Sequence, residues 1–168
     1  YTPLYTLSLH DALPIYVLYS GTVSAATEGA ILGVPALAVS LDTHKEADFT
    51  YAAKFARKMT KLILKNRKQL TGSAINVNVP CIPREQIKGV VVVRQAQSNI
   101  VETFEKRIDP RENIYYWFAK ESQSARKQKD TDVGALAAGY ITITPIHFDL
   151  TRYDLLETLQ SVMKTDIG

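Results

Sequence analysis

The chain has 168 residues, of which 46% are hydrophobic and 22% are charged, a composition typical of one globular domain. Its net charge of +3 at pH 7 is too small to require a nucleic-acid partner. The single cysteine, Cys81, excludes an intrachain disulfide and a zinc site built from cysteines, and it fits a cytoplasmic location.

Residues 1–16 show no regular pattern. Two prolines interrupt them, they are too short to span a membrane, and no basic segment precedes an apolar one as in a signal peptide. Residues 9–15 (LHDALPI) resemble translated sequencing-adapter DNA. We interpret residues 1–16 as a non-native segment and residues 17–168 as the folded domain.

A short apolar run at residues 16–18 precedes Ser20-Gly21-Thr22, and a helix is expected from about Thr22 to Leu32. Backbone N–H groups at such a helix start can bind phosphate, and Gly21 leaves room for an anion. Ser and Thr are also ordinary helix caps, and taken alone the segment favours a cap. Gly33 and Pro35 predict the end of the helix.

A buried parallel strand is expected at residues 36–41, followed by a helix that begins at a capping box formed by Thr43 and Glu46. The predicted buried stripe of this helix is Phe49, Ala52, Ala53, Ala56, Met59 and Ile63, and the helix ends near Asn66. Seven basic residues between positions 54 and 68 favour a solvated outer face. A phosphate-attracting or nucleic-acid role is the lesser alternative.

The second half of the chain predicts strands at 74–79, 90–94 and 140–144, and a β-hairpin at about 99–120 around a turn containing Pro110. Residues 122–129 are expected to form a polar loop. Thr151 and Asp154 are expected to cap a final helix at about 151–165. The strand-helix alternation of the first half predicts an α/β fold.

Four blocks of the chain resemble, in the same order, the stationary-phase survival protein (SurE) family. The blocks are residues 19–41 (YSGTVSAATEGAILGVPALAVSL), 75–89 (INVNVP to QIKG), 109–117 (DPR with YW) and 131–151 (TD, GYITITP and DLT). The resemblance implies an α/β fold, specifically the C-terminal portion of a Rossmann-like three-layer α/β/α fold with a β-hairpin extension and a C-terminal helix. It also implies a metal-dependent 5'-nucleotidase that uses Mg or Mn to hydrolyse nucleoside 5'-monophosphates.

The resemblance further implies a homodimer or homotetramer that forms through the hairpin and the C-terminal helix, with no membrane and no nucleic-acid partner expected. The aromatic side chains of the hairpin would then form an interface rather than a local core. They are Phe104, Tyr115, Tyr116, Trp117 and Phe118.

This chain departs from the family pattern at the metal site. In the family, two adjacent aspartates near the amino terminus, a serine and an asparagine complete that site, whereas this chain contains no Asp-Asp pair. We therefore assign no catalytic residue and no metal ligand here, and keep Ser20, Gly21 and Thr22 as the phosphate-binding residues. The alternative to an active nucleotidase is an inactive fragment with a residual phosphate loop and an oligomerisation region.

Other polar residues have structural interpretations that we favour. His44 lies in the predicted capping segment, and His147 with Asp149 is expected to brace the turn before the last helix. Asp132 is as consistent with a loop brace as with a substrate contact. Asn76 and Asn78 are expected to hydrogen-bond neighbouring segments.

Overall fold

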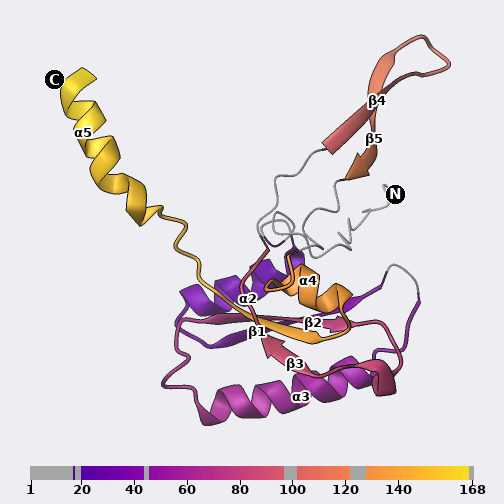
Figure 1. The fold of residues 1–168 in the computed structure, drawn as a ribbon, viewed down its shortest axis with the longest axis vertical. Coiled ribbons are helices and arrows are strands. Elements are labelled where there is room, and N and C mark those ends of the chain that lie inside the picture. The colour runs from indigo at the N-terminus through magenta and orange to yellow at the C-terminus, as the bar shows by residue number, and fades with distance from the viewer. Residues whose placement is uncertain (1–16, 18–19, 44–45, 97–101, 122–127, 167–168) are drawn as a thin grey trace.

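The computed structural model describes residues 17, 20–43, 46–96, 102–121 and 128–166; the expectations for residues 1–16 and for His44 lie outside this part. The body is a four-stranded sheet of β1 (Ala36–Asp42), β2 (Ala74–Pro80), β6 (Ile141–Ile146) and β3 (Val90–Val92), in the order β1-β2-β6-β3. Helices α2 (Gly21–Ile31) and α4 (Asp132–Ala137) cover one face of the sheet, and α3 (Thr50–Lys65) covers the other (Figure 1). The expected α/β/α layering is confirmed.

Helix α2 confirms the predicted bounds to within one residue. Val23, Ala26 and Ala30 are buried on its inner face, where they pack with Ala38 and Ala74 of the sheet. These small side chains allow the helix to lie close to the strands. The helix ends where Gly33 adopts a positive φ of 77°, a conformation that glycine reaches at little cost.

The strands pair in a mixed sheet. β1 runs parallel to β2, as expected, while β6 is antiparallel to β2 and parallel to β3. β2 lies between two strands and all of its residues are buried. Its odd-numbered residues Ile75, Val77 and Val79 belong to the core against α3, and Ala74 belongs to the core against α2.

Helix α3 differs from the expectation at its start. It begins at Thr50, so the predicted capping box of Thr43 and Glu46 is wrong. The carboxylate of Asp48 instead accepts a hydrogen bond of 2.8 Å from the backbone N–H of Thr50, which satisfies a donor that the helix leaves free.

The buried stripe of α3 consists of Ala52, Phe55, Met59 and Ile63. Phe49 and Ala53, which the predicted stripe included, are exposed. Moving the helix start to Thr50 leaves Phe49 before the first turn, and Phe55 completes the spacing of three to four residues that one helix face requires.

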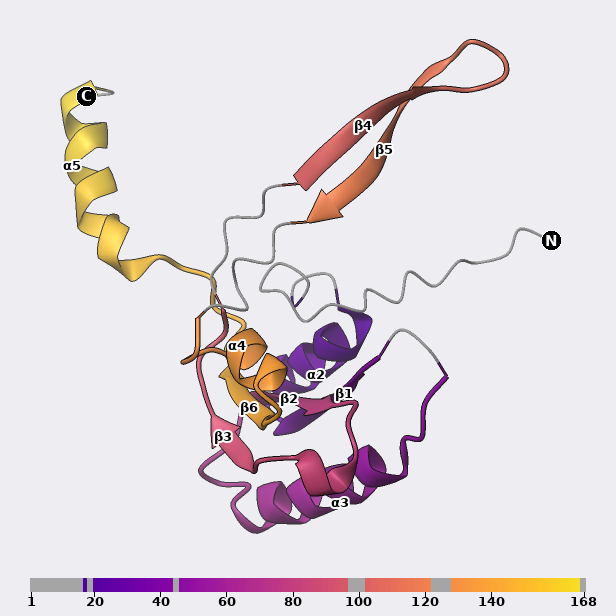
Figure 2. The same ribbon diagram turned by 45° about the vertical axis from the view of Figure 1, so that its right-hand side comes forward.

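A β-hairpin, called here the arm, is formed by β4 (Glu102–Ile108) and β5 (Ile114–Glu121) and stands off the body (Figure 2). Its turn is closed by Asp109, which accepts hydrogen bonds from the backbone N–H groups of Arg111 and Asn113 and from the Asn113 side chain. This confirms the predicted hairpin. The side chains of Phe104 and Phe118 lie outside the described part.

The two ends of the segment that carries the arm meet at what we call the arm root, residues 94–96 and 130–132. The backbone N–H of Asp132 donates to the Arg94 carbonyl at 3.0 Å, and the Asp132 carboxylate accepts from the Ala96 N–H at 2.8 Å. Arg94 also forms a two-bond ion pair with Asp130. A backbone hydrogen bond, a hydrogen bond to a buried carboxylate and a surface ion pair therefore hold the two sides of the root together.

The chain ends in a short 3-10 turn, η3 (Tyr153–Leu155), followed by α5 (Leu156–Asp166). The final helix is confirmed, but its predicted cap is wrong, because Asp154 pairs with Arg152 and Thr151 donates its N–H to Asp149. Like the arm, α5 extends away from the sheet (Figures 1 and 2). No helix in the described part of the chain is long and apolar enough to cross a membrane.

Candidate functional site

Ser20 caps helix α2. Its backbone is extended, its side-chain oxygen accepts the N–H of Val23 at 3.3 Å, and its carbonyl accepts the N–H of Ser24 at 2.8 Å. This is the geometry of an N-cap, so the capping interpretation of the sequence is confirmed.

The cap leaves two donors at the helix start. Within the described part of the chain, the N–H groups of Gly21 and Thr22 have no hydrogen-bond partner. Both residues are exposed, and a Cβ placed on Gly21 would meet no atom within 4 Å. An anion can therefore approach these two donors without displacing a described group.

The electrostatics of this end also favour an anion. The first turn of α2 contains no acidic side chain, so nothing within the turn offsets the partial positive charge of the helix start. The Thr22 hydroxyl lies on the same turn and can add a donor. A phosphate placed here would gain from both the backbone donors and the helix dipole.

The start of α2 lies at one particular edge of the sheet. α2 runs antiparallel to β1, since Gly29 near its end approaches Ala36 at the beginning of the strand. Its start therefore points toward the edge where the parallel strands β1 and β2 end. Ligands of open α/β sheets bind at that edge.

Polar side chains are buried in the sheet on the face that α2 and α4 cover. Asn78 donates from its amide nitrogen to the Thr142 hydroxyl at 3.4 Å, as expected for a residue that ties neighbouring strands together. Asn76 lies opposite Thr144, and the Asn76 Oδ1 and the Thr144 Oγ1 have no partner among the described atoms. The threonines were missed, although their alternation in the Ile-Thr-Ile-Thr run matches that of Asn-Val-Asn in β2.

Asp132 acts as a brace. It is 1% exposed, and its Oδ1 accepts the N–H groups of Ala96 and Val133, each at 2.8 Å. Burial raises the pKa of this carboxyl, and the two backbone donors oppose that shift. These contacts join the arm root to the start of α4, a role that the sequence left open beside a substrate contact.

His147 and Asp149 form the brace that the sequence predicted before the last helix. The N–H of Asp149 donates to the His147 Nδ1 at 3.1 Å, and the Asp149 carboxylate accepts from Thr151 and Tyr153. The hydrogen bonds from Thr151 and Tyr153 hold the pKa of Asp149 at about 2. Both side chains stabilise this turn.

A divalent metal is the cofactor that the family resemblance implies. Among the described residues, no group of three or more His, Cys, Asp or Glu side chains could hold a metal ion. The described residues therefore do not fit a metal centre.

Comparison with known proteins identifies the family. The family model described as "Survival protein SurE" matches residues 11–102. The chain belongs to the SurE family. It is 50% identical to the 5'-nucleotidase SurE of Syntrophus aciditrophicus (strain SB), over 90% of this chain and 57% of the relative. It is 43% identical to the 5'-nucleotidase SurE of Syntrophobacter fumaroxidans (strain DSM 10017 / MPOB), over 86% of this chain and 58% of the relative.

The crystal structure of the SurE protein from Aquifex aeolicus has a similar fold, with a TM-score of 0.76 and 35% sequence identity. The match covers 90% of this chain and 61% of that one. The SurE chain described here thus spans a little under three fifths of the length of these two curated relatives.

Proposed function

We propose that this chain carries the phosphate-binding part of a 5'-nucleotidase. The observation that supports this proposal is the open start of α2, where Gly21 and Thr22 present backbone donors beside the Ser20 cap. A nucleoside 5'-monophosphate would place its phosphate against these donors, and the reaction of the intact family would cleave the phosphate ester. The 5'-nucleotidase names of the relatives supply the substrate class.

We further propose that the chain binds phosphate but does not hydrolyse the ester by itself. In the family resemblance the cleavage depends on Mg or Mn, and the described residues offer no group that fits such an ion. A phosphate bound to two amides and a hydroxyl is held and oriented, but the charge that develops during ester cleavage lacks its main stabiliser. Purified chain should release no phosphate from nucleoside monophosphates with Mg or Mn, and metal-stimulated turnover would contradict this proposal.

Binding can be tested separately from turnover. Gly21→Val places a branched side chain in front of the two amides, and the open space around Gly21 indicates that the variant folds. Ala25→Val is the matched control, because it adds the same side chain at an exposed position one turn further along α2. Amide chemical shifts of the full chain would be followed during titration with adenosine 5'-monophosphate and with inorganic phosphate.

We expect both ligands to shift the Gly21 and Thr22 amides in the native chain and in Ala25→Val. Gly21→Val should lose at least tenfold in affinity while keeping the native circular dichroism spectrum. Native-like binding by Gly21→Val would place the phosphate elsewhere. Loss of the fold in Gly21→Val would mean that the segment acts only as a cap and turn.

We also propose that the chain self-associates as a homodimer or homotetramer through the arm and α5. Both elements stand off the body, and both expose large apolar side chains. On the arm, Tyr116 is 67% exposed and Trp117 53%; on α5, Leu159 is 55% exposed. Light scattering should give a mass above one chain, and Trp117→Lys or Leu159→Lys should lower it. A native chain that is monomeric at micromolar concentration would contradict this.

A further inference from the structure

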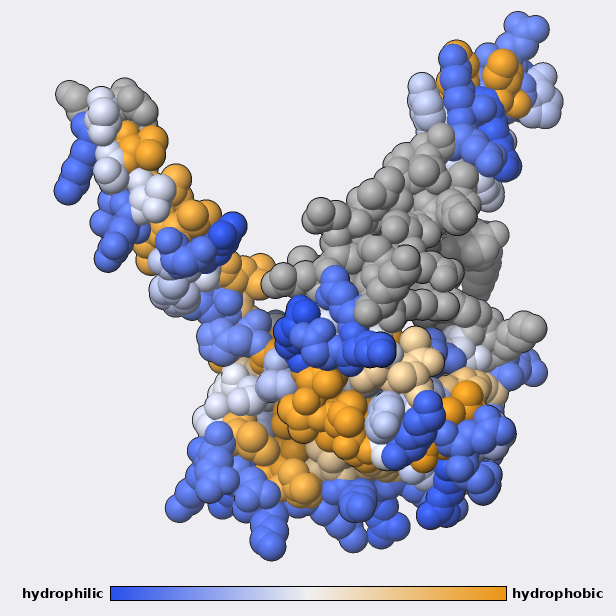
Figure 3. All heavy atoms as spheres, viewed as in Figure 1, coloured by the Kyte–Doolittle hydropathy of each residue, from blue (hydrophilic) through white to orange (hydrophobic). Residues whose placement is uncertain are grey.

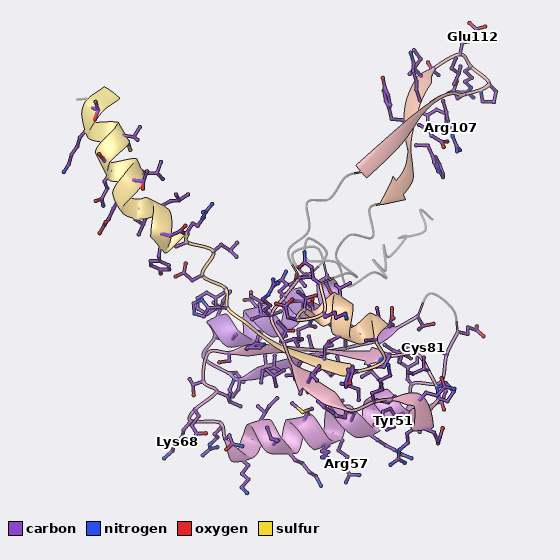
Figure 4. The ribbon with its side chains drawn as sticks, viewed as in Figure 1. Tyr51, Arg57, Lys68, Cys81, Arg107 and Glu112 are labelled. Carbon is purple, nitrogen blue, oxygen red and sulfur yellow. The ribbon has the colours of Figure 1, made fainter. Side chains whose placement is uncertain are left out.

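The outer face of α3 is rich in basic side chains. Four lysines, Lys54, Lys58, Lys61 and Lys65, recur at intervals of four, three and four residues, which places them on one face of the helix. All four are exposed, and this face lies opposite the buried stripe of α3. Arg57 lies beside them, and Figure 4 shows it directed away from the sheet. We call these five residues, together with Arg67 and Lys68, the basic face.

The charge of the basic face has little local compensation, although Asp48, which precedes the helix, interacts electrostatically with Lys54. Residues 49–84 contain no Asp or Glu, and no ion pair within the described part of the chain involves any of the seven side chains. The whole chain carries a net charge of only +3, so the remaining residues are net negative. The seven basic residues are therefore concentrated on α3 and just beyond its end, on one side of the sheet. Hydrophilic side chains line this lower margin of the body in Figure 3.

Like charges at these helical intervals repel one another and disfavour the helix. An anionic partner that bridges neighbouring lysines would replace this repulsion with attraction. The stripe from Lys54 to Lys65 is about 16 Å long at the rise of an α-helix. A linear chain of phosphates is the partner whose charge spacing suits such a stripe, since one nucleic-acid strand presents a phosphate about every 3.4 Å of duplex axis.

We propose that the basic face is a docking surface for the phosphate backbone of nucleic acid, independent of base sequence. This revises the expectation from the sequence that no nucleic acid is bound, and it does not depend on the proposed nucleotidase function. Sequence-specific or stacking recognition is not built into this face. The aromatic ring in the first turn of α3, Tyr51, is already in contact with Arg84, whose guanidinium lies 5.7 Å from the ring centre.

A lipid surface fits the helix less well. An interfacial helix buries its apolar face among the lipid chains, but the apolar face of α3 is occupied by the protein core through Phe55, Met59 and Ile63. Leu62 and Leu64 are the only large apolar side chains of α3 that are exposed. Phosphate contacts need only the charges, which are all at the surface.

The test uses the full chain and a fluorescein-labelled, 20-nucleotide single-stranded RNA of mixed sequence, followed by fluorescence anisotropy. If four phosphates are neutralised, log K should fall against log salt with a slope of about −2.8, so affinity should drop about 50-fold from 50 to 200 mM salt. Changing Lys54, Lys58, Lys61 and Lys65 together to glutamine should weaken binding at least tenfold and reduce the magnitude of the slope from about 2.8 to below about 1.

The matched control changes four exposed basic residues outside α3, the arm and α5 to glutamine, with the same loss of net charge: Lys88, Arg94, Lys129 and Arg152. This control should stay within threefold of the native affinity. Equal losses in both variants would show that net charge alone is responsible and would overturn the proposal. So would the absence of measurable RNA binding at 50 mM salt, or binding to vesicles containing phosphatidylglycerol without binding to RNA.

Discussion

Replacing Gly134 by alanine in α4 sets two physical effects of opposite sign against each other. Gly134 lies inside the helix, where alanine is favoured over glycine by about 0.5–1 kcal/mol. A Cβ at this position, however, would lie 2.0 Å from the Gln128 carbonyl oxygen and 2.7 Å from its carbon. Both atoms belong to the backbone, so no side chain can rotate away to make room.

The magnitude follows from what must move. The contact is shorter than an ordinary one by about 1.4 Å or more, so either α4 or the backbone at residues 128–129 must shift by that amount. The Gln128 carbonyl accepts the Thr131 hydroxyl at 2.6 Å and the Thr131 N–H at 3.2 Å, and a shift weakens both bonds. Overpacking costs typically 1–3 kcal/mol and each weakened hydrogen bond about 0.5–1.5 kcal/mol, so the net loss should be about 2–4 kcal/mol.

Thermal unfolding followed by circular dichroism measures this difference. A loss of about 2–4 kcal/mol corresponds to a melting temperature lower by about 4–16 °C in a domain of this size. Gly21→Ala is the control, since it adds the same methyl group at the start of α2 with no atom within 4 Å, and it should not lower the melting temperature. A Gly134→Ala protein as stable as the native chain would refute the close approach of α4 to residue 128.

Three further predictions concern the core and the buried and exposed carboxylates. Phe55→Ala should lower the free energy of unfolding in urea by about 3–5 kcal/mol, because Phe55 is buried on the inner face of α3. Phe49→Ala should change it by less than about 1 kcal/mol, because Phe49 is exposed. Equal effects would mean that Phe49 also belongs to the buried stripe, as the sequence predicted. Asp132→Asn keeps the acceptor oxygen but removes a buried carboxyl whose pKa is raised above 3.8. The free energy of unfolding of the native chain should therefore fall, relative to that of the variant, as pH rises through the raised pKa. A difference that is constant from pH 4 to 8 would contradict this. The carboxyl of Asp149, with its pKa held at about 2, should stabilise the fold above pH 3.8 and lose that contribution as pH falls through 2. Tyr153→Phe removes one of the hydrogen bonds to this carboxyl and should raise its pKa in an NMR titration. An unchanged midpoint would rule out the Tyr153 hydrogen bond as a cause of the low pKa.

Local signals in the sequence were enough to predict the elements whose ends are determined by their own residues. The end of α2 follows from Gly33, and the arm turn is closed by Asp109 and Asn113, all within a few residues of the element concerned. The start of α3 was misplaced, because the sequence suggested the Thr43–Glu46 capping box, whereas in the structure the Thr50 N–H is bound by Asp48. In such cases tertiary packing decides between local alternatives of similar free energy.

The features that were missed depend on distant contacts. Helix α4 has only six residues, and its stability depends on burial against the sheet rather than on a periodic pattern. The direction of β6 and its pairing with β2 join residues more than sixty positions apart. For the proposed phosphate site, the sequence predicted both the Ser20 cap and the room at Gly21, and in the structure a Cβ on Gly21 would meet no atom within 4 Å.

The arm root determines how this part of the fold can vary in length. Its two stems are neighbours, joined by the Asp132–Arg94 and Ala96–Asp132 hydrogen bonds, so the chain leaves the sheet and returns to it at nearly the same point. Lengthening or shortening what lies between them changes the closure entropy only slowly, with each doubling of length costing about 0.6 kcal/mol. The sheet and α2 can therefore stay constant while insertions and deletions accumulate between the stems. An engineered insertion placed between the stems should be tolerated for the same reason.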